Sequence, residues 1–442
     1  MVSDGKNKIG GAEMENPGKQ MYGIAGELFP ICRSITGDGV RQTLQILKRT
    51  IPQMDIIEVP SGTRAFDWEV PKEWNISEGY IENSSGVRIV DFKDNNLHIM
   101  GYSTAVDAYV PLEELKKHIY TEESQPTLIP YVTSYYKKRF GFCMSEEQKN
   151  SLPEDTYHMV IKSELKQGSM TYGEVVIPGE SKEEIFLSTY ICHPSMANNE
   201  CSGPALAAYL AKYLTQREDR RYTYRIVFVP ETIGSIYYLS KNKDNLKSHM
   251  IAGFNLSCVG DNNDYSIVES RYGDTLADRV LKNVLHYHCE SYTAYSFLKR
   301  GSDERQYNAP GIDLPVVSFC RTKYGEYPQY HTSADDMGYV SPEGFQGSFE
   351  VMEKVVNALE HNQYYKINVL CEPQLGKRGL YPTVSKKGQY DEIYGLTTFI
   401  AYADGNNDLI GISDRIGCPI DRLIDIVEML KGSGLLDIVE EK

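Results

Sequence analysis

The sequence lacks the features that mark an exported, membrane-spanning or nucleic-acid-binding protein. Its first twenty residues are polar and contain no apolar segment of the kind found in a signal peptide. No run of about 18 uninterrupted apolar residues is present, so no membrane-spanning helix is expected. The net charge of −15 disfavours general binding to nucleic acid or to a membrane surface. We therefore expect a cytoplasmic protein without a membrane partner.

The chain also lacks any pair of cysteines in a C-x-x-C arrangement, although it contains nine cysteines. A structural zinc finger is therefore not expected. Cys192, Cys201, Cys258 and Cys320 lie in apolar stretches, where the reduced thiols of a protein core are usually found. The cysteine pattern thus indicates a reducing compartment.

Apolar strands alternate with helical segments from about Tyr157 to the end of the central part of the chain. The segments EEIFLSTYIC and YTYRIVFVPE have the continuous apolar character of buried strands, and GPALAAYLAKYLTQR between them has helical spacing. This alternation predicts an α/β fold in which helices cover both faces of a mostly parallel sheet. We assign residues 21–60 and 136–366 to this core domain.

Two further parts of the chain differ from this pattern. Residues 61–135 contain short alternating runs broken by proline, glycine and asparagine, which predicts a β-rich domain inserted into the core. The runs HMVIKSEL and MTYGEVVIPG that follow are predicted to form a hairpin. Residues 375–442 contain short helical patterns around a tight turn, which is typical of a small winged-helix domain. This domain has no stripe of lysine and arginine, so a protein contact is at least as favoured as nucleic acid.

Four groups of polar residues follow predicted strands or begin the helices after them. The groups are His193 with residues 198–203, residues 230–235, residues 301–305 and residues 330–336. Parallel strands present their carboxyl ends at one edge of a sheet, so groups that are distant in the sequence can meet there. We expect a site at this edge.

In this order and spacing, the groups resemble those of the co-catalytic zinc aminopeptidases over residues 155–360. More closely, the segments CHPSMANN, VPETIGS, GSDERQY and YHTSADDM look like those of an uncharacterised bacterial family with an aminopeptidase-like domain. Members of that family are often labelled polysaccharide-biosynthesis proteins. The resemblance implies an aminopeptidase-like core, an inserted β domain and a C-terminal winged helix, which are the three parts found above.

The resemblance also implies two zinc-binding histidines, His193 and His331, and a general base, Glu231. Other positions of the family pattern differ here. The aspartate that bridges two metal ions falls at Asn199, whose amide oxygen is a poor zinc ligand, and the second residue of a Glu-Glu pair falls at Thr232. The His-x-Asp motif has become His-Pro-Ser, so the carboxylate that orients the histidine is missing. A site for two metal ions is therefore not expected.

What remains is a prediction of one zinc ion held by His193, His331 and the neighbouring Glu200. Glu231 would act as the base beside this ion. Glu200 has a second interpretation as an acidic residue that is stabilised at the start of a helix.

Substrate contacts are predicted for Asn199, Asp303 and Arg305, again from the resemblance. For Asp303 and Arg305 the alternative is an ion pair within their loop. Arg33 and Arg41 flank a glycine-rich turn, where they either bind an anionic group or belong to a structural link between two helices.

The leading hypothesis is a metal-dependent hydrolase that cleaves an amide or peptide bond of a small amino-terminated or acylated substrate. The link to polysaccharide biosynthesis comes from the resemblance alone. The main alternative is a binding or scaffold protein on a peptidase frame that has lost its catalytic function, which Asn199 and Thr232 favour. A third hypothesis, a DNA-binding regulator, is disfavoured by the net charge.

Overall fold

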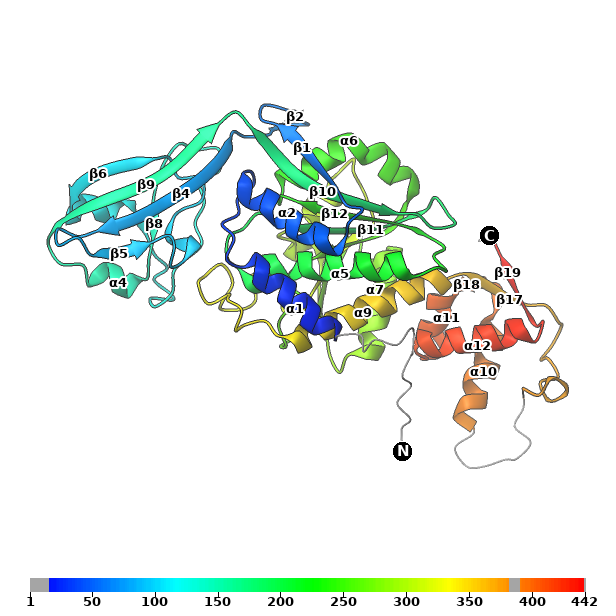
Figure 1. Cartoon of the computed structure of the whole chain (residues 1–442). Helices are drawn as coiled ribbons and strands as arrows, with labels where there is room; N and C mark the ends of the chain where they lie inside the picture. Colours follow the sequence, from blue (N-terminus) through cyan, green and yellow to red (C-terminus); the bar gives the residue numbers. More distant parts are fainter. Residues whose placement is uncertain (1–15, 381–389, 441–442) are drawn as a thin grey trace.

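The computed structural model describes residues 16–380 and 390–440. In Figure 1 the inserted domain lies at the left, the α/β core in the middle and the C-terminal domain at the right. Among the helices of these described ranges, none combines the length and the apolar character needed to cross a membrane.

An eight-stranded sheet forms the centre of the core, in the order β1-β10-β12-β11-β13-β16-β14-β15. The four central strands, β12, β11, β13 and β16, are parallel, whereas β10 and β14 run antiparallel to the strands beside them in this group. The predicted α/β fold with a mostly parallel sheet is therefore confirmed. The strands are β1 (Asp55–Pro60), β10 (Ser169–Ile177), β11 (Glu184–Tyr190), β12 (Thr223–Val229), β13 (Met250–Leu256), β14 (Ser266–Val268), β15 (Thr293–Tyr295) and β16 (Val316–Cys320).

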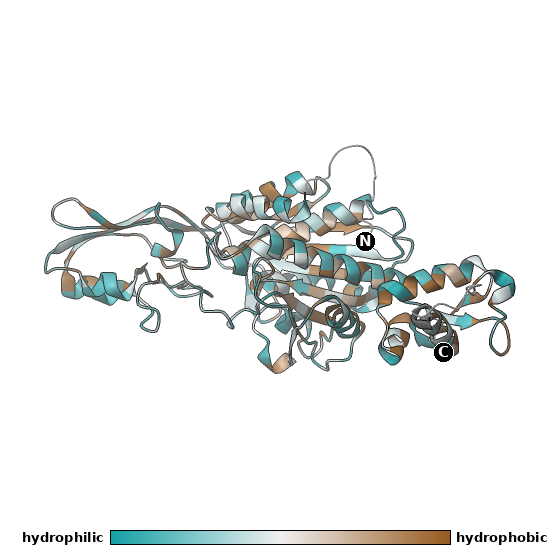
Figure 2. Ribbon diagram, turned by 90° about the horizontal axis from the view of Figure 1, so that it is seen from below, coloured by the Kyte–Doolittle hydropathy of each residue, from teal (hydrophilic) through white to brown (hydrophobic). Residues whose placement is uncertain are grey.

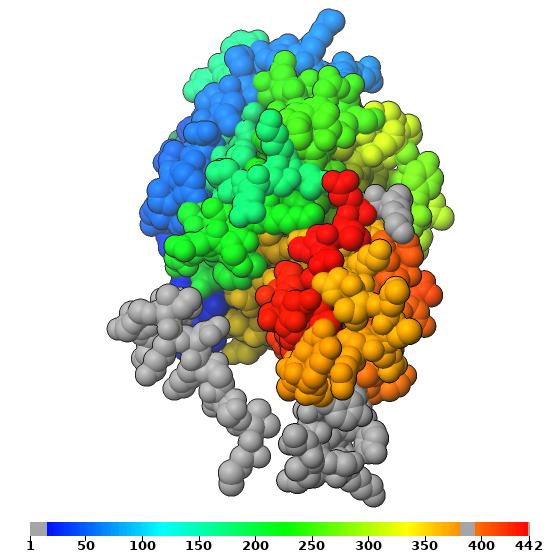
Figure 3. Space-filling view, turned by 90° about the vertical axis from the view of Figure 1, so that its right-hand side faces the viewer, coloured from blue at the N-terminus to red at the C-terminus, as the bar shows by residue number. Residues whose placement is uncertain are grey.

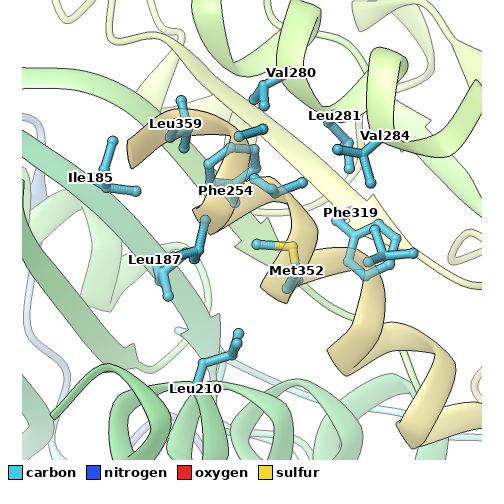
Figure 4. Packing of buried hydrophobic residues seen from close by; sticks show 14 of the residues in the cluster. Ile185, Leu187, Leu210, Phe254, Val280, Leu281, Val284, Phe319, Met352 and Leu359 are labelled. Atoms are coloured by element: carbon cyan, nitrogen blue, oxygen red, sulfur yellow. The ribbon is translucent and has the colours of Figure 1, made fainter. Parts of the chain in front are cut away.

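Helices cover both faces of the sheet because its central strands are apolar on both sides. In β11, Ile185 and Leu187 belong to one apolar cluster, and Phe186 between them belongs to the other. Figure 4 shows Leu187 in the first cluster between Leu210 and Met352, which come from two helices. The first face carries α1 (Pro17–Leu28), α2 (Asp38–Thr50), α5 (Ser202–Gln216), α7 (Leu276–His288) and α9 (Pro342–His361), and the second carries α6 (Ile233–His249) and α8 (Glu304–Tyr307).

The core helices are amphipathic, as expected of helices with one side on a sheet and the other in water. Figure 2 shows hydrophilic and hydrophobic segments alternating along the long helices. Helix α5 departs from this pattern because α1, α2 and α9 pack around it, and most of its residues are buried. The first turn of α5 begins beside the predicted site, so the packing of this helix fixes the position of one end of that site.

The inserted domain is built on a four-stranded sheet in the order β5-β4-β9-β6. Strand β9 lies beyond residue 135, where the sequence analysis placed the end of the insertion, so the inserted sheet extends to Lys166. A short hairpin of β2 and β3 precedes the sheet and packs on α6 of the core. The elements are β2 (Arg64–Ala65), β3 (Trp68–Glu69), β4 (Glu73–Glu82), β5 (Arg88–Asp91), β6 (Val106–Pro111), α3 (Leu112–Leu115), β7 (Ile119–Tyr120), β8 (Phe142–Cys143), α4 (Glu146–Asn150) and β9 (Thr156–Lys166).

The predicted hairpin between β9 and β10 is wrong. Strand β9 pairs with β4 and β6, whereas β10 pairs with β1 and β12. The chain passes from β9 in the inserted sheet directly into β10 in the core sheet. The segment from β1 to β4 makes the same passage beside it, so Pro60 of β1 is paired with Ser169 of β10 and Glu73 of β4 is paired with Lys166 of β9. Side chains alternate in the same way whether two consecutive strands form a hairpin or belong to two different sheets. The sequence pattern therefore did not distinguish the two arrangements.

An ion-pair network fixes the inserted domain to the core at this junction. Arg41 of α2 lies 3.1 Å from Glu58 of β1 and 2.6 Å from Glu73 of β4. Hydrogen bonds from Arg41 lower the pKa of the Glu73 carboxyl to about 2. Arg41 therefore belongs to a structural link, the second of its two interpretations from the sequence.

The C-terminal domain has a three-stranded sheet in the order β18-β17-β19. Its central strand β17 precedes residue 375, so the domain begins earlier than the sequence analysis placed it. Figure 3 shows its orange and red surface packed directly against the core. The elements are β17 (Tyr364–Ile367), α10 (Tyr390–Tyr402), β18 (Asp404–Asp408), α11 (Leu409–Ile416), α12 (Ile420–Gly432) and β19 (Leu436–Val439).

A close backbone contact at the start of α5 gives a test of the core packing. A Cβ at Gly203 would lie 2.4 Å from the carbonyl oxygen of Leu256 and 2.4 Å from Oγ1 of Thr189, whereas a Cβ at Gly23 of α1 meets no atom within 4 Å. We expect Gly203→Ala to lower the free energy of unfolding by about 1–3 kcal/mol through overpacking. Gly23→Ala is the matched control and is expected to raise it by about 0.5–1 kcal/mol, since alanine favours a helix. Urea unfolding measures both, and equal effects of the two substitutions would contradict this packing.

Candidate functional site

The polar groups predicted from the sequence lie at the carboxyl edge of the four parallel strands. His193 comes three residues after β11, and Glu231 comes two residues after β12. One π-helical turn, Ala197–Cys201, precedes α5 and carries Asn199 and Glu200. Turns of this kind are rare in proteins, and those that occur are often found at functional sites. The turn brings the chain back so that Glu200 lies beside His193.

The ring of His193 lies between two carboxylates. Its Nδ1 donates to Oε2 of Glu200 at 2.7 Å, and its Nε2 lies 3.6 Å from Oε2 of Glu231. Burial lowers the pKa of His193, but the contacts of its ring with Cys192 and Glu200 outweigh burial and raise this pKa well above its usual value. Burial raises the pKa of the Cys192 thiol to about 12, so the thiol is neutral at pH 7 and Glu200 provides the stabilising charge. Glu200 thereby supplies the orienting carboxylate that the His-Pro-Ser motif lacks.

This hydrogen bond gives Glu200 a different place from the predicted one. The two nitrogen atoms of an imidazole ring point to opposite sides, and Glu200 occupies the Nδ1 side. A metal ion on Nε2 would lie on the side of Glu231 instead. We therefore interpret Glu200 as the residue that orients His193, a role that the spacing of the motif did not indicate.

Glu231 is the most accessible of these three residues. Its side chain is 21% exposed, against 8% for His193 and 0% for Glu200. Burial raises the pKa of Glu231, and the charges of His193 and Arg305 oppose that rise in part. The backbone N–H of Glu231 donates to Sγ of Cys192 at 3.3 Å, which holds the turn after β12. A carboxylate held at a cavity in this way can exchange protons with a bound molecule.

His331 lies at the same edge, less close to His193 than Glu200 is. Its ring centre is 5.5 Å from that of His193, and the ring of Tyr131 contacts both rings at 5.0 and 5.1 Å. Burial and the charge of His193 lower the pKa of His331 to about 3, so this histidine is neutral. A tighter group, in which possible ligand atoms lie within 4.8 Å of one another, consists of Cys192, His193 and Glu200.

Four buried side-chain atoms with lone pairs on the predicted site residues have no hydrogen-bond partner among the described residues. They are Oδ1 of Asn199, Oε1 of Glu200, Oδ2 of Asp303 and Nε2 of His331. Leaving a buried polar atom unpaired costs on the order of 1–3 kcal/mol. Oxygen and imidazole nitrogen are ligands of Zn²⁺, and a cation satisfies lone pairs that no protein donor reaches. These unpaired atoms are of the kind that binds a metal ion, but among the described residues His331 belongs to no group of three possible ligand atoms that lie within 4.8 Å of one another.

The three residues predicted to contact substrate occupy different places. Asn199 is buried, and its side-chain amide donates to the hydroxyl of Tyr190 at 2.8 Å. Asp303 is also buried, and its Oδ1 accepts from the backbone N–H of Thr232 at 2.8 Å, beneath the start of α6. Arg305 donates to the hydroxyl of Thr232 at 3.0 Å and forms no ion pair with Asp303. Of the three residues, Arg305 is the one that lines a cavity at the site.

This cavity has a volume of about 320 Å³ and opens beside His193 and Glu231. Larger cavities lie elsewhere, but this one is lined by His193 and Glu231, two groups with raised pKa values at the carboxyl edge of the sheet. Part of its wall is aromatic and was missed by the sequence analysis, because nothing in the spacing of these residues ties them to His193. The other lining residues are Ile35, Trp68, Tyr135, Tyr136, Cys192, Thr232, Ile233 and Arg305.

The sheet and the position of the site define an aminopeptidase-like α/β protein. A zinc aminopeptidase from Bacillus subtilis has the same fold, with a TM-score of 0.57 at 12% identity over 79% of this chain and 96% of that chain. A peptidase M28 precursor from Shewanella amazonensis gives a TM-score of 0.53 at 12% identity over 83% of this chain and 96% of that chain. At such low identity the likeness concerns the fold alone.

The chain belongs to the family described as a domain of unknown function, DUF4910, which matches residues 22–362. A winged helix-turn-helix matches residues 362–438. The chain is 44% identical over 426 residues to a Clostridium acetobutylicum protein named as a candidate polysaccharide biosynthesis protein with an aminopeptidase-like domain, over 96% of this chain and 97% of that protein. A crystal structure of a candidate peptidase from the same species is 42% identical, with a TM-score of 0.90 over 96% of both chains. The resemblance inferred from the sequence is thus confirmed.

Proposed function

We propose that this protein is a metal-dependent hydrolase that cleaves an amide or peptide bond of a small peptide-like or aminoacyl substrate. The observation that carries the proposal is the position of Glu231, a carboxylate of raised pKa that shares a cavity with His193. A buried carboxylate of this kind is typical of an acid–base catalyst. The name of the Clostridium acetobutylicum relative suggests polysaccharide biosynthesis as the setting of the reaction.

The metal ion in this proposal is a single zinc ion held by Nε2 of His193 and Nε2 of His331. Glu200 keeps its hydrogen bond to Nδ1 of His193, the arrangement in which a carboxylate orients a ligating histidine. A bound zinc ion polarises a carbonyl group and lowers the pKa of water. The unpaired Nε2 of His331 and its low pKa suit a ligand, since a histidine must be neutral to bind a metal ion. His193, whose pKa is raised, would have to release the proton of its Nε2 when the ion binds.

Glu231 is the proton carrier of the proposed reaction. It accepts a proton from water as the water oxygen bonds to the carbonyl carbon of the substrate. It then gives that proton to the nitrogen atom as the carbon–nitrogen bond breaks, so a carboxylic acid and an amine leave the site. A raised pKa suits both transfers, because a proton carrier works best when its pKa is near the working pH.

Replacement of Glu231 tests this role. We expect Glu231→Gln to lower kcat by about 10²-fold to 10⁴-fold, because the amide keeps the shape of the side chain and cannot carry the proton. Glu218→Gln changes an exposed glutamate of the same chain and is expected to leave kcat unchanged. Hydrolysis of aminoacyl 4-nitroanilides and N-acetyl amino acids by the zinc-loaded protein is the measurement. Full activity in Glu231→Gln would contradict the assignment.

Metal content tests the ligands separately. Protein purified without chelator and dialysed against a slight excess of zinc is expected to hold about one zinc ion per chain. The ion should be lost in His193→Gln and in His331→Gln, and retained in His286→Gln, which changes an exposed histidine of α7. Cys192→Ser should also retain zinc, and its loss there would place the ion on the Nδ1 side of His193 instead.

A binding or scaffold function is the second candidate, and one observation favours it. Both ring nitrogens of His193 already lie near a carboxylate, Nδ1 at 2.7 Å from Glu200 and Nε2 at 3.6 Å from Glu231. Thr232 and Asn199 occupy two positions where the resemblance expects metal ligands. Absence of zinc from the dialysed protein, together with absence of hydrolysis, would favour this candidate over the hydrolase.

The C-terminal domain is proposed to be a packed protein module and not a DNA-binding domain. In winged helices that bind DNA, the N-terminal end of the second helix of the motif contacts the bases. Here the first turn of that helix, α12, is turned toward the core: Ile420 is 3% exposed, and Asp421 lies 2.5 Å from Lys354 of α9. Acidic residues also outnumber basic ones along α12.

DNA binding by the full chain is therefore expected to be weak. In fluorescence anisotropy with a random duplex at low salt, we expect no saturation up to on the order of 10 µM protein. The reason is that the start of α12 lies against α9 of the core and that the helix has more acidic than basic residues. Tighter binding that weakens steeply with added salt would contradict this assignment.

A cytoplasmic location also remains a proposal. It is supported by the nine cysteines, all of which are free in the structure. Free, mostly buried thiols are usual in proteins of a reducing compartment.

A further inference from the structure

The cavity beside Glu231 has an aromatic side wall that the proposed reaction does not use. Trp68 of the β2–β3 hairpin and Tyr136 form an edge-to-face pair with ring centres 5.9 Å apart. Tyr135, next in the chain to Tyr136, lines the same cavity. Burial raises the pKa of both tyrosines to about 12, so their rings are neutral at pH 7. The wall therefore offers flat, uncharged surfaces to a bound molecule.

Two features distinguish this wall from ordinary surface. Trp68 is 39% exposed and Tyr136 is 54% exposed, so the two large rings are left partly uncovered at the mouth of the cavity. Tyr136 also has a φ of 64°, a left-handed backbone conformation that residues other than glycine rarely adopt. A strained residue at a cavity is a sign of function, because the strain persists only where the surroundings hold it.

Arg305 lies in the same cavity and carries a positive charge. Its Nε donates to the carbonyl oxygen of Ser302 at 2.8 Å, and a terminal nitrogen donates to the hydroxyl of Thr232 at 3.0 Å. No carboxylate of the described residues lies within salt-bridge distance of it. The two hydrogen bonds to neutral groups fix the guanidinium, while its charge acts on Glu231 and Asp303 without a direct ion pair to either. Such a group suits a carboxylate, which the planar guanidinium binds through paired hydrogen bonds.

We propose that this cavity binds the leaving residue of the substrate, and that this residue has a free carboxylate and an aromatic or branched apolar side chain. Arg305 binds the carboxylate, and Trp68 and Tyr136 contact the side chain. The inference rests on the proposed hydrolase function and names its substrate class: N-acylated apolar amino acids and dipeptides. A volume of about 320 Å³ is at the small end for a ligand cavity, which suits one such residue and not a long peptide.

The bond changes are those of the proposed hydrolysis. Water adds its oxygen to the acyl carbon, the carbon–nitrogen bond breaks, and the proton carried by Glu231 goes to the leaving nitrogen. The leaving residue then departs as a free amino acid whose carboxylate was bound by Arg305 throughout. A chain extended beyond this carboxylate would replace the charge by a neutral amide and lose the contact.

Intrinsic fluorescence tests the proposal, because the chain contains two tryptophans. Trp74 is 4% exposed and stacks on Tyr102 at 5.7 Å, whereas Trp68 lines the cavity. The full-length Glu231→Gln protein, loaded with zinc, is titrated with N-acetyl-L-phenylalanine. We expect a saturable change of fluorescence that is absent from a Glu231→Gln, Trp68→Phe double variant.

The matched ligand and variants identify the contacts. N-acetyl-L-phenylalaninamide, which lacks the negative charge, should bind to the Glu231→Gln protein roughly 10-fold to 100-fold more weakly than N-acetyl-L-phenylalanine does. The acid should lose affinity by the same factor when Arg305→Met is added to that protein. Arg305→Lys keeps the charge without the planar fork and should give an intermediate affinity if the fold is intact. Arg300→Met, at an exposed arginine five residues away, should bind normally. N-acetylglycine should bind more weakly than the phenylalanine derivative, because it has no side chain to contact Trp68.

The outcomes separate this inference from the proposed activity. Equal affinity for the acid and the amide overturns the inference, even if the wild-type protein hydrolyses other substrates. Saturable binding of N-acetylglucosamine in preference to the acid also overturns it, because the aromatic wall would then serve a sugar. Selective binding of the acid by a protein that hydrolyses nothing supports the inference and contradicts the hydrolase.

Discussion

The site depends on one hydrogen bond, the contact between Nδ1 of His193 and the carboxylate of Glu200. Glu200 reaches this position because the π-helical turn before α5 brings it back beside the end of β11. The turn is itself held by Asp335, whose carboxylate accepts the backbone N–H groups of Asn198 and Asn199 at 2.6 and 3.0 Å. A different local structure thus supplies what the His-x-Asp motif supplies in the resembled family, a fixed ring with Nε2 directed to the cavity.

Arg33 reinforces the same arrangement. It is 2% exposed, and its Nε donates to the carbonyl oxygen of His193 at 3.0 Å while another nitrogen donates to Sγ of Cys201 at 3.2 Å. These bonds join the two ends of the loop that carries His193 and Glu200. A buried cation needs such partners, since burying a charge without hydrogen bonds is very costly. Of the two interpretations from the sequence, the structural one describes the contacts of Arg33, which donates to two backbone carbonyl oxygens and to a thiol.

The parts of this protein that could be predicted from sequence are those set by local pattern. Continuous apolar strands between amphipathic helices gave the core fold, and polar residues at strand ends gave the position of His193 and Glu231. Contacts between distant segments were not predictable in this way. Trp68 reaches the cavity because it lies on a two-stranded hairpin that packs on α6. The orientation of Glu200 depends on a π-helical turn. Neither feature produces a repeating pattern of apolar residues that could be recognised in the sequence. The extent of the inserted domain was missed for the same reason, since β9 is defined by its partners.

The inserted domain is part of the site. Its segment around Tyr131 runs beside the loop of His331: the N–H of Tyr131 donates to the carbonyl oxygen of His331, and the N–H of Ser333 donates to that of Ile129, both at 2.8 Å. His331 has a φ of 56°, a conformation that needs external support in a residue with a side chain. These backbone bonds give that support, and the ring of Tyr131 then lies against both histidines. Because the insertion both contacts the loop of His331 and walls the cavity, likeness of fold alone does not transfer an activity to this chain.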